Sequence, residues 1–301
     1  MASIAIEVTR LALRCVSAFS PETAGRLAFR LFSVTPSRKP SNAKEKAALT
    51  AAEPVMAGAH RVTLSYAGGW VVAKRFRAPS DGAAKRVLLV HGWGSRSDYL
   101  AAMIKGLLAG GAEVIALDWP GHGASPGRTL TMPAAVRAID AAWRHFDGFD
   151  VAVGHSFGGA SLACAAGGLV CDVPSRIAGS MVLIGAPSEM TWLFKGFGKL
   201  LRLSHKAQAA LEGMVVQLSG RRIEDFDAAR ILGVLTVPVL VIHAEDDKEV
   251  SADHARRYAA AGANVELHWA NGLGHRRIVS APPVIERINA FIHAEERRAA
   301  A

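Results

Sequence analysis

A serine flanked by glycines, in Gly154-His155-Ser156-Phe157-Gly158, constrains the fold of this chain more than any other feature. The segment matches the pattern G-x-S-x-G; an apolar run, residues 150–153, precedes it, and small residues, 159–166, follow it. This order predicts a strand, a sharp turn and a helix, which together expose the serine hydroxyl. The N-terminus of the helix would favour negative charge developing beside the serine. We therefore expect Ser156 to be a nucleophile.

Apolar runs alternate with helix-like segments from about residue 60 onward. The expected strands are residues 61–66, 70–76, 86–90, 114–117, 150–153, 180–184, 237–242 and 265–269, with helices ending near 108 and spanning 132–146 and 283–297. Repeated strand–helix units are typical of α/β proteins, in which helices cover both faces of a mostly parallel β-sheet. The first two strands are expected to form a hairpin around two glycines.

Residues 1–50 are expected to form amphipathic helices and a linker, and residues 51–301 the main α/β domain. Apolar residues at positions 4, 8, 11, 15 and 19 repeat at helical spacing, and Ser20-Pro21 is typical of the start of a second helix. The polar and basic segment 36–46 is expected to be the linker. We expect the helices to pack on the main domain; a weak membrane-surface contact through residues 1–35 is the alternative.

Residues 188–230 interrupt the alternation of strands and helices with a helical segment rich in leucine and aromatic residues. In a doubly wound sheet, an insertion at this point lies above the carboxyl ends of the strands, where ligands bind. We interpret this segment as a small lid.

A serine hydroxyl needs a base to accept its proton, and an acid commonly orients that base. On such a sheet the three residues occur in the chain order serine, acid, histidine. His275 follows the last expected strand on a glycine-flanked loop and is the candidate base. Asp246 and Asp247 both follow an earlier strand. We favour Asp247, because Asp-x-x-Val is the usual form of this loop, and Asp246 is the alternative.

Two main-chain amides are needed to stabilise an oxyanion during acyl transfer. The amide of Phe157, directly after the serine, is one candidate donor. The loop 91–94, His-Gly-Trp-Gly, follows an earlier strand and nominates the amide of Trp93 as the other.

Taken together, these segments resemble the α/β-hydrolase superfamily, specifically its serine-nucleophile branch of esterases and lipases, over residues of about 60 to 295. The resemblance rests on His91-Gly92-Trp93-Gly94, on Asp118-Trp119-Pro120-Gly121-His122-Gly123, on the serine pentapeptide, and on Asp247 and Gly274-His275. It implies a catalytic triad of Ser156, Asp247 and His275 beneath a lid. The superfamily hosts many chemistries, so the resemblance does not identify the substrate.

The resemblance leads us to expect a serine hydrolase that cleaves a carboxylic ester, or a related acyl compound, through a seryl-acyl intermediate. The expected partner is a small-molecule acyl substrate. Thioesterase, carbon–carbon bond hydrolase and peptidase activities are alternatives, as is a ligand-binding or scaffolding protein that keeps the fold without turnover.

The composition argues against several other classes of protein. The net charge is +9, but the basic residues are dispersed along the chain, so we expect no nucleic-acid binding. The three cysteines form no disulfide or metal pattern, which favours a cytoplasmic location. We also expect no cofactor and no metal, because the sequence contains neither a dinucleotide fingerprint nor a cluster of metal ligands.

Overall fold

The computed structural model of the protein describes residues 4–78 and 84–300, with side chains described as far as residue 295. The helices are α1 (Ile4–Phe19), α2 (Pro21–Ser33), α3 (Ala43–Met56), α4 (Ala101–Ala109), α5 (Met132–Phe146), α6 (Phe157–Ala166), α7 (Met190–Leu201), α8 (His205–Ser219), α9 (Ala228–Val234), α10 (Ala252–Ala259), α11 (Gly274–Arg277) and α12 (Pro282–Ala300). The strands are β1 (His60–Tyr66), β2 (Gly69–Phe76), β3 (Arg86–Val90), β4 (Glu113–Asp118), β5 (Val151–His155), β6 (Ser180–Ile184), β7 (Val239–His243) and β8 (Val265–Trp269). Short 3₁₀ helices span Ser97–Leu100, Ile223–Asp225 and Ile278–Ser280.

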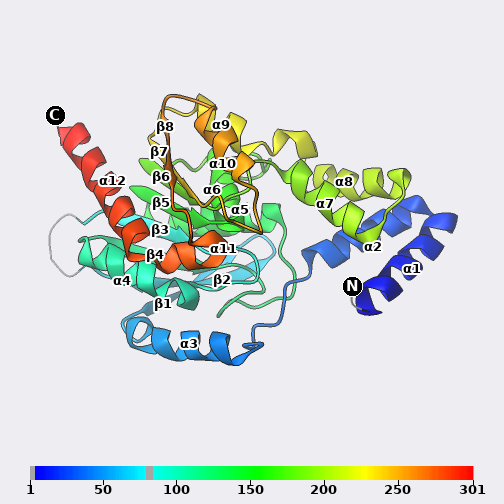
Figure 1. The fold of residues 1–301 in the computed structure, drawn as a ribbon, viewed down its shortest axis with the longest axis horizontal. Helices are drawn as coiled ribbons and strands as arrows, with labels where there is room; N and C mark the ends of the chain where they lie inside the picture. Colours follow the sequence, from blue (N-terminus) through cyan, green and yellow to red (C-terminus); the bar gives the residue numbers. More distant parts are fainter. Residues whose placement is uncertain (1–3, 79–83, 301) are drawn as a thin grey trace.

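The strands form one sheet in the order β1-β2-β4-β3-β5-β6-β7-β8. The pairs of β2 with β1 and with β4 are antiparallel, and all other pairs are parallel (Figure 1). The α/β class with a mostly parallel sheet, predicted from the sequence, is therefore confirmed.

The central strands are apolar on both faces because helices cover both sides of the sheet. In β3, Leu88 and Val90 pack into one core with α5, α6 and α10, whereas Val87 and Leu89 pack into a second core with α4 and α12. The central strands β3 to β7 thus contribute alternate residues to the two cores, as the pleat of a strand requires.

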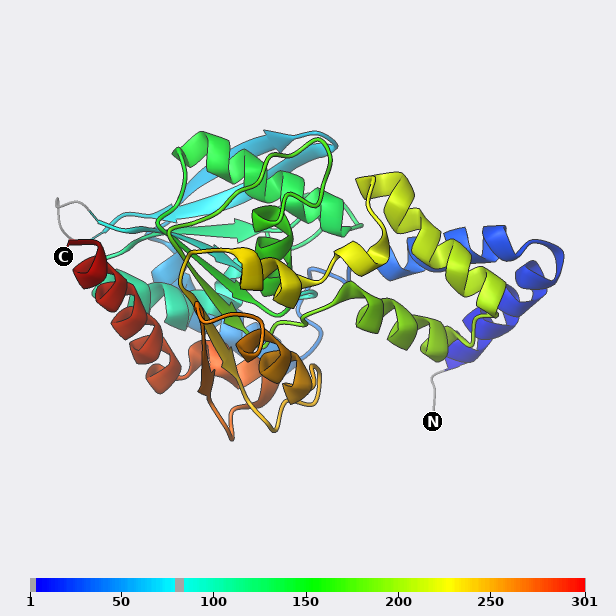
Figure 2. The same ribbon diagram turned by 90° about the horizontal axis from the view of Figure 1, so that it is seen from above.

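The predicted lid leaves the sheet after β6 and returns before β7, and it contains α7, α8 and α9. Its base is closed by a bridge between Glu189 and Asp227, flanked by a hydrogen bond from the Met190 amide to the Phe226 carbonyl. Helices α7 and α8 lie beside α1 and α2 at one end of the molecule, away from α12 (Figures 1 and 2). We call the group α1, α2, α7 and α8 the cap.

Helix α2 packs against α8 at backbone distance. A Cβ atom at Gly25 would lie 2.5 Å from the Cβ of Ala210 and 2.7 Å from the carbonyl oxygen of Ala207. Glycine is therefore required for this close approach. The end of α2 is tied to the α/β body by hydrogen bonds from Leu130 to the carbonyl of Ser33 and from Thr35 to the carbonyl of Arg128.

Two details of the N-terminal region differ from the prediction. Helix α3 begins at Ala43, inside the segment 36–46 that was expected to be a linker, and Asn42 caps it by accepting a hydrogen bond from the Glu45 amide. Helix α1 packs on α2 and α7, but its expected apolar face points outward and Leu13 is its buried residue. Among the described residues, no helix is both long enough and apolar enough to cross a bilayer.

Candidate active site

Ser156 stands at the turn between β5 and α6 in a strained conformation. Its φ of 54° and ψ of −121° are rare for a residue with a side chain. A Cβ atom at Gly154 would lie 2.6 Å from the amide nitrogen of Gly159, and one at Gly158 would lie 2.7 Å from the carbonyl oxygen of His91. Only glycine fits at both positions, so this sequence can close the sharp turn that presents the serine.

His275 lies at the start of α11 and is paired with Asp247, which follows β7. The imidazole Nδ1 is 2.7 Å from Oδ2 of Asp247. An ionised carboxylate can only accept a hydrogen bond, so Nδ1 donates and Nε2 is left free to accept a proton. The alternative acid, Asp246, instead accepts the amide of Gly272 at 2.7 Å. The geometry therefore pairs the imidazole with Asp247 and not with Asp246.

The other oxygen of Asp247 is also held by the protein. Oδ1 accepts the amides of Glu249 at 2.7 Å and Val250 at 2.9 Å. Burial opposes ionisation of Asp247, but the hydrogen bonds with His275 and with these amides outweigh it and keep the pKa of the carboxyl below its usual value. His243 supports the same loop by donating from Nε2 to the carbonyl of Val250 at 3.0 Å. Asp247 is thus a fixed anion at neutral pH.

Ser156 and His275 line the same cavity. In the part of the chain that the structure describes, the Ser156 hydroxyl forms no hydrogen bond with His275, which is common before substrate binds. His155 joins the two loops: its Nε2 donates to the main-chain carbonyl of His275 at 2.9 Å, and the two rings are 4.8 Å apart between centroids. The elbow and the loop of the candidate base are therefore held together directly.

The residues of the two predicted oxyanion donors, Trp93 and Phe157, line the same cavity as Ser156. The amides of Trp93 and Phe157 donate to no other group within the described residues. A Cβ atom at Gly92 would lie 3.0 Å from the Cβ of Ser156, so the 91–94 loop passes directly against the elbow. Two unpaired amides beside a serine are the arrangement that an oxyanion requires.

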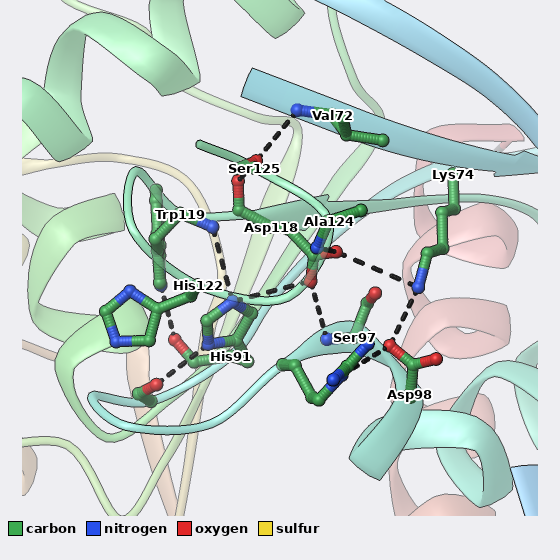
Figure 3. Close-up of polar contacts among 12 residues, drawn as sticks. Val72, Lys74, His91, Ser97, Asp98, Asp118, Trp119, His122, Ala124 and Ser125 are labelled. Atoms are coloured by element: carbon green, nitrogen blue, oxygen red, sulfur yellow. Dashed lines mark hydrogen bonds and ion pairs between the residues drawn. The ribbon is translucent and has the colours of Figure 1, made fainter. Parts of the chain in front are cut away.

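The loop after β4, which contains the motif 118–123, holds the 91–97 segment in place (Figure 3). Asp118 accepts the amide of Ser97 at 2.8 Å, and His122 Nε2 accepts the amide of Gly94 at 3.0 Å. His122 Nδ1 in turn donates to the carbonyl of Pro120 at 3.0 Å, so the ring is neutral. The sequence singled out this motif without a role; in the structure it fixes the loop that carries the Trp93 amide.

A buried lysine balances the charge of Asp118. Lys74 from β2 is 2 % exposed, lies 2.8 Å from Asp98 and 3.7 Å from Asp118, and its ammonium points between the two carboxylates (Figure 3). Burial raises the pKa of Asp98, but hydrogen bonds from Lys74 and Arg96 more than offset this and lower it. The alternation of side chains along β2 would place an apolar residue at position 74. A lysine stands there instead, and it pairs with the carboxylates of Asp98 and Asp118.

The cavity above Ser156 has a volume of about 470 Å³ and an apolar wall. The wall includes Phe29, Phe32 and Val34 from the end of α2 and its exit, Trp93 and Phe157 beside the elbow, and Trp192, Phe194 and Phe197 from α7. The ring of Phe32 lies 5.1 Å from that of Phe197 and 6.4 Å from that of Trp93 between centroids. Helix α2 is therefore part of the wall, which the sequence did not predict.

Across residues 4–78 and 84–295, no group of three or more His, Cys, Asp or Glu side chains could hold a metal ion. Cys15, Cys164 and Cys171 are free thiols.

The buried histidines predict how the stability of the protein depends on pH. Burial lowers the pKa of His91 to about 4 and that of His155 to about 3, so both remain neutral in the folded protein at pH values where the unfolded chain takes up protons. Stability should therefore fall as the pH drops below about 6.5, the usual histidine value; the contribution of His91 should keep falling to about pH 4 and that of His155 to about pH 3. From pH 6 to pH 5 we expect a loss of about 2 kcal/mol in the free energy of unfolding.

Urea unfolding at several pH values measures this loss. The variant His155→Gln, whose amide can still donate to the His275 carbonyl, should show a shallower dependence on pH. A free energy of unfolding that stays constant between about pH 7 and pH 5 would contradict the prediction.

Comparison with known proteins gives the same fold. Est1E from Butyrivibrio proteoclasticus superposes with a TM-score of 0.61 at 18% identity, covering 79% of this chain and 99% of that one. The esterase RhEst1 from Rhodococcus sp. ECU1013 superposes with a TM-score of 0.56 at 18% identity, covering 77% of this chain and 98% of that one. Proline iminopeptidase from Mycobacterium smegmatis superposes with a TM-score of 0.60 at 16% identity, covering 80% of this chain and 100% of that one. No curated protein sequence matches the chain.

The profile of a family described as "Alpha/beta hydrolase family" matches residues 87–287, which is more than half of the chain and includes all the loops described above. The chain belongs to the alpha/beta hydrolase family.

Proposed function

We propose that the protein is a serine hydrolase that cleaves carboxylic esters of small molecules through a seryl-acyl intermediate, with Ser156, His275 and Asp247 as its catalytic triad. The observation that carries this proposal is the 2.7 Å contact between His275 and Asp247 at a cavity that also exposes the strained Ser156. A histidine oriented by a carboxylate beside a serine is the arrangement that makes a hydroxyl nucleophilic at neutral pH.

The first half-reaction forms the acyl-enzyme. The Ser156 oxygen attacks the ester carbonyl carbon while its proton moves to Nε2 of His275, and Asp247 stabilises the resulting imidazolium. The amides of Trp93 and Phe157 bind the oxyanion of the tetrahedral intermediate. The carbon–oxygen bond to the leaving group then breaks as His275 returns the proton to the departing alcohol.

The second half-reaction releases the acid. Water replaces the alcohol, gives a proton to His275 and attacks the acyl carbon. The serine–acyl bond breaks when the proton returns to Ser156. These steps need no cofactor or metal, and three free thiols suit the reducing cytoplasm that we propose as the location.

The apolar wall favours esters whose acyl group is apolar. The volume of about 470 Å³ accommodates a group well beyond acetyl. We expect kcat/KM for chromogenic esters to rise about tenfold or more from the acetate to the octanoate, because each buried methylene adds binding energy in the transition state.

Two measurements test the proposed function together. A fluorophosphonate probe should label the folded protein covalently, and the ester series should be turned over with the predicted order. Failure of both would support the alternative of a ligand-binding protein on the same fold. Labelling together with turnover of only thioesters or peptides would assign the triad to that chemistry instead.

A further inference from the structure

Helix α1 presents a stripe of apolar side chains to solvent on the cap above the cavity. Ile4 is 85% exposed, Val8 62%, Leu11 59% and Phe19 93%. Cys15, which continues the same spacing, is also exposed. Residues three and four apart share one face of a helix, so these five form one continuous stripe, the α1 stripe, roughly 22 Å long.

This stripe is not a loosely attached segment. The opposite side of α1 is fixed to the cap, with Leu13 buried, with Arg10 donating to the carbonyl of Leu200 at 2.7 Å, and with the hydroxyls of Ser17 and Ser204 3.0 Å apart. The fold therefore holds the more apolar face of α1 outward, which is the reverse of an ordinary surface helix.

A groove between α1 and α2 leads from the stripe toward the active site. Its lining comes almost entirely from apolar side chains, among them Val8, Leu13 and Leu27, and its volume is about 350 Å³. Leu31 and Val34 line both this groove and the cavity that contains Ser156. An apolar wall thus continues from the outer surface of the cap to the nucleophile.

The cap is also basic. Its segments 4–33 and 190–219 contain eight lysine and arginine residues and only three acidic residues. The basic residues are Arg10, Arg14, Arg26, Arg30, Lys195, Lys199, Arg202 and Lys206, and the acidic ones are Glu7, Glu22 and Glu212. Arg30 lies on the wall of the groove itself. An exposed apolar face on a cap with an excess of positive charge fits a surface that is apolar inside and negatively charged outside.

We propose that the cap docks on an anionic phospholipid surface through the α1 stripe, and that acyl esters held in that surface enter the cavity along the α1–α2 groove. The stripe lies in the interface between headgroups and acyl chains, as amphipathic interfacial helices do. The positive charges of the cap meet the lipid phosphates, and the groove offers an acyl chain a continuous apolar route to Ser156. The docking step is independent of catalysis, and the delivery of a substrate rests on the proposed function.

Vesicle flotation of the full chain tests the docking, with Ser156→Ala as the background so that no turnover is involved. The unmodified cap should float with vesicles of phosphatidylcholine and phosphatidylglycerol and much less with phosphatidylcholine alone. Binding should weaken as salt is added, because the charge attraction is screened. In the double variant Leu11→Gln, Phe19→Gln the partition coefficient should fall about tenfold or more, since two apolar side chains no longer enter the interface.

The matched control replaces exposed apolar residues elsewhere on the molecule. Val234 at the end of α9 is 78% exposed and Ile177 is 41% exposed, so Val234→Gln with Ile177→Gln also replaces two exposed apolar side chains and should leave binding unchanged. Both double variants change exposed residues and should unfold at the temperature of the parent protein.

Three results would overturn the docking proposal. One is that the protein with the unmodified stripe stays out of the anionic vesicle fraction. Another is that the α1 double variant binds as well as its control. The third is a dimer of the unmodified protein that the α1 double variant converts to monomer without any vesicle binding, which would assign the stripe to a second copy of the chain. Absence of ester hydrolysis by the protein with Ser156 in place, together with intact vesicle binding, would overturn the proposed function alone.

Discussion

Replacing Ser156 with alanine is expected to abolish ester turnover and fluorophosphonate labelling while the protein remains folded. The loss in kcat should be on the order of 10⁵- to 10⁶-fold, because no other group can form the acyl-enzyme. Alanine fits the position sterically and keeps the positive φ of 54°, so the thermal unfolding midpoint should stay close to that of the unmodified protein. Steady-state kinetics and gel-based labelling measure the two losses.

His275→Ala should cost a similar factor, and the combination with Ser156→Ala should cost little more than either change alone, since the two residues act as one unit. The matched control is His268→Ala on β8. This histidine is partly exposed, and its side chain forms no hydrogen bond or ion pair with the described residues. Substantial turnover by His275→Ala, or labelling that persists in Ser156→Ala, would show that the nucleophile or base has been assigned to the wrong residue.

Replacing Asp247 with asparagine should lower kcat by about 10⁴-fold, whereas Asp246→Asn should change it only a few-fold. An asparagine amide at position 247 could donate to Nδ1 and so select the tautomer whose Nε2 carries a proton, which cannot accept one from Ser156. Asp246 accepts the Gly272 amide instead, so its substitution affects only the neighbouring loop.

The two variants are matched controls for each other, because each replaces an aspartate with asparagine and the two positions are adjacent in the sequence. Kinetics on the best ester of the chain-length series, with circular dichroism to compare folding, measures the ratio. If Asp246→Asn lost more activity than Asp247→Asn, the catalytic acid would be Asp246, and the loop would have to rearrange when substrate binds.

The sheet was predictable because its central strands are short and buried on both faces. Runs such as 86–90 and 180–184 coincide with β3 and β6, since a strand between two helical layers is apolar at nearly every position. Helix α3 was not predicted because its sequence is polar and basic at its start. The signal that could have located it is Asn42, a favourable N-cap residue placed three residues before Glu45.

The residues of the candidate site were also predictable one by one, because each follows a strand and the carboxyl ends of parallel strands meet at one edge of the sheet. The residues that hold these site residues in place could not be predicted, because their roles depend on contacts between loops that are distant in the sequence. His122 bonds the amide of Gly94, and His155 bonds the carbonyl of His275, across separations that no spacing rule describes.

The role of the N-terminal helices shows a further limit of sequence patterns. Helical spacing of apolar residues indicates a face but not the surface that this face contacts. In α2 the pattern accompanies packing against α8 and contributes Phe29 and Phe32 to the cavity wall. In α1 the side chains that make up the same kind of pattern are exposed to solvent.

The fit of Gly25 against α8 has a practical consequence for engineering. Two stretches that are far apart in the gene, residues 21–33 and 190–219, interlock without room for a methyl group and together shape the wall around the substrate. A chimera that imports only residues 188–230 from a relative would set a foreign α8 against the resident α2. Selectivity should therefore be transplanted by exchanging both stretches as a matched pair.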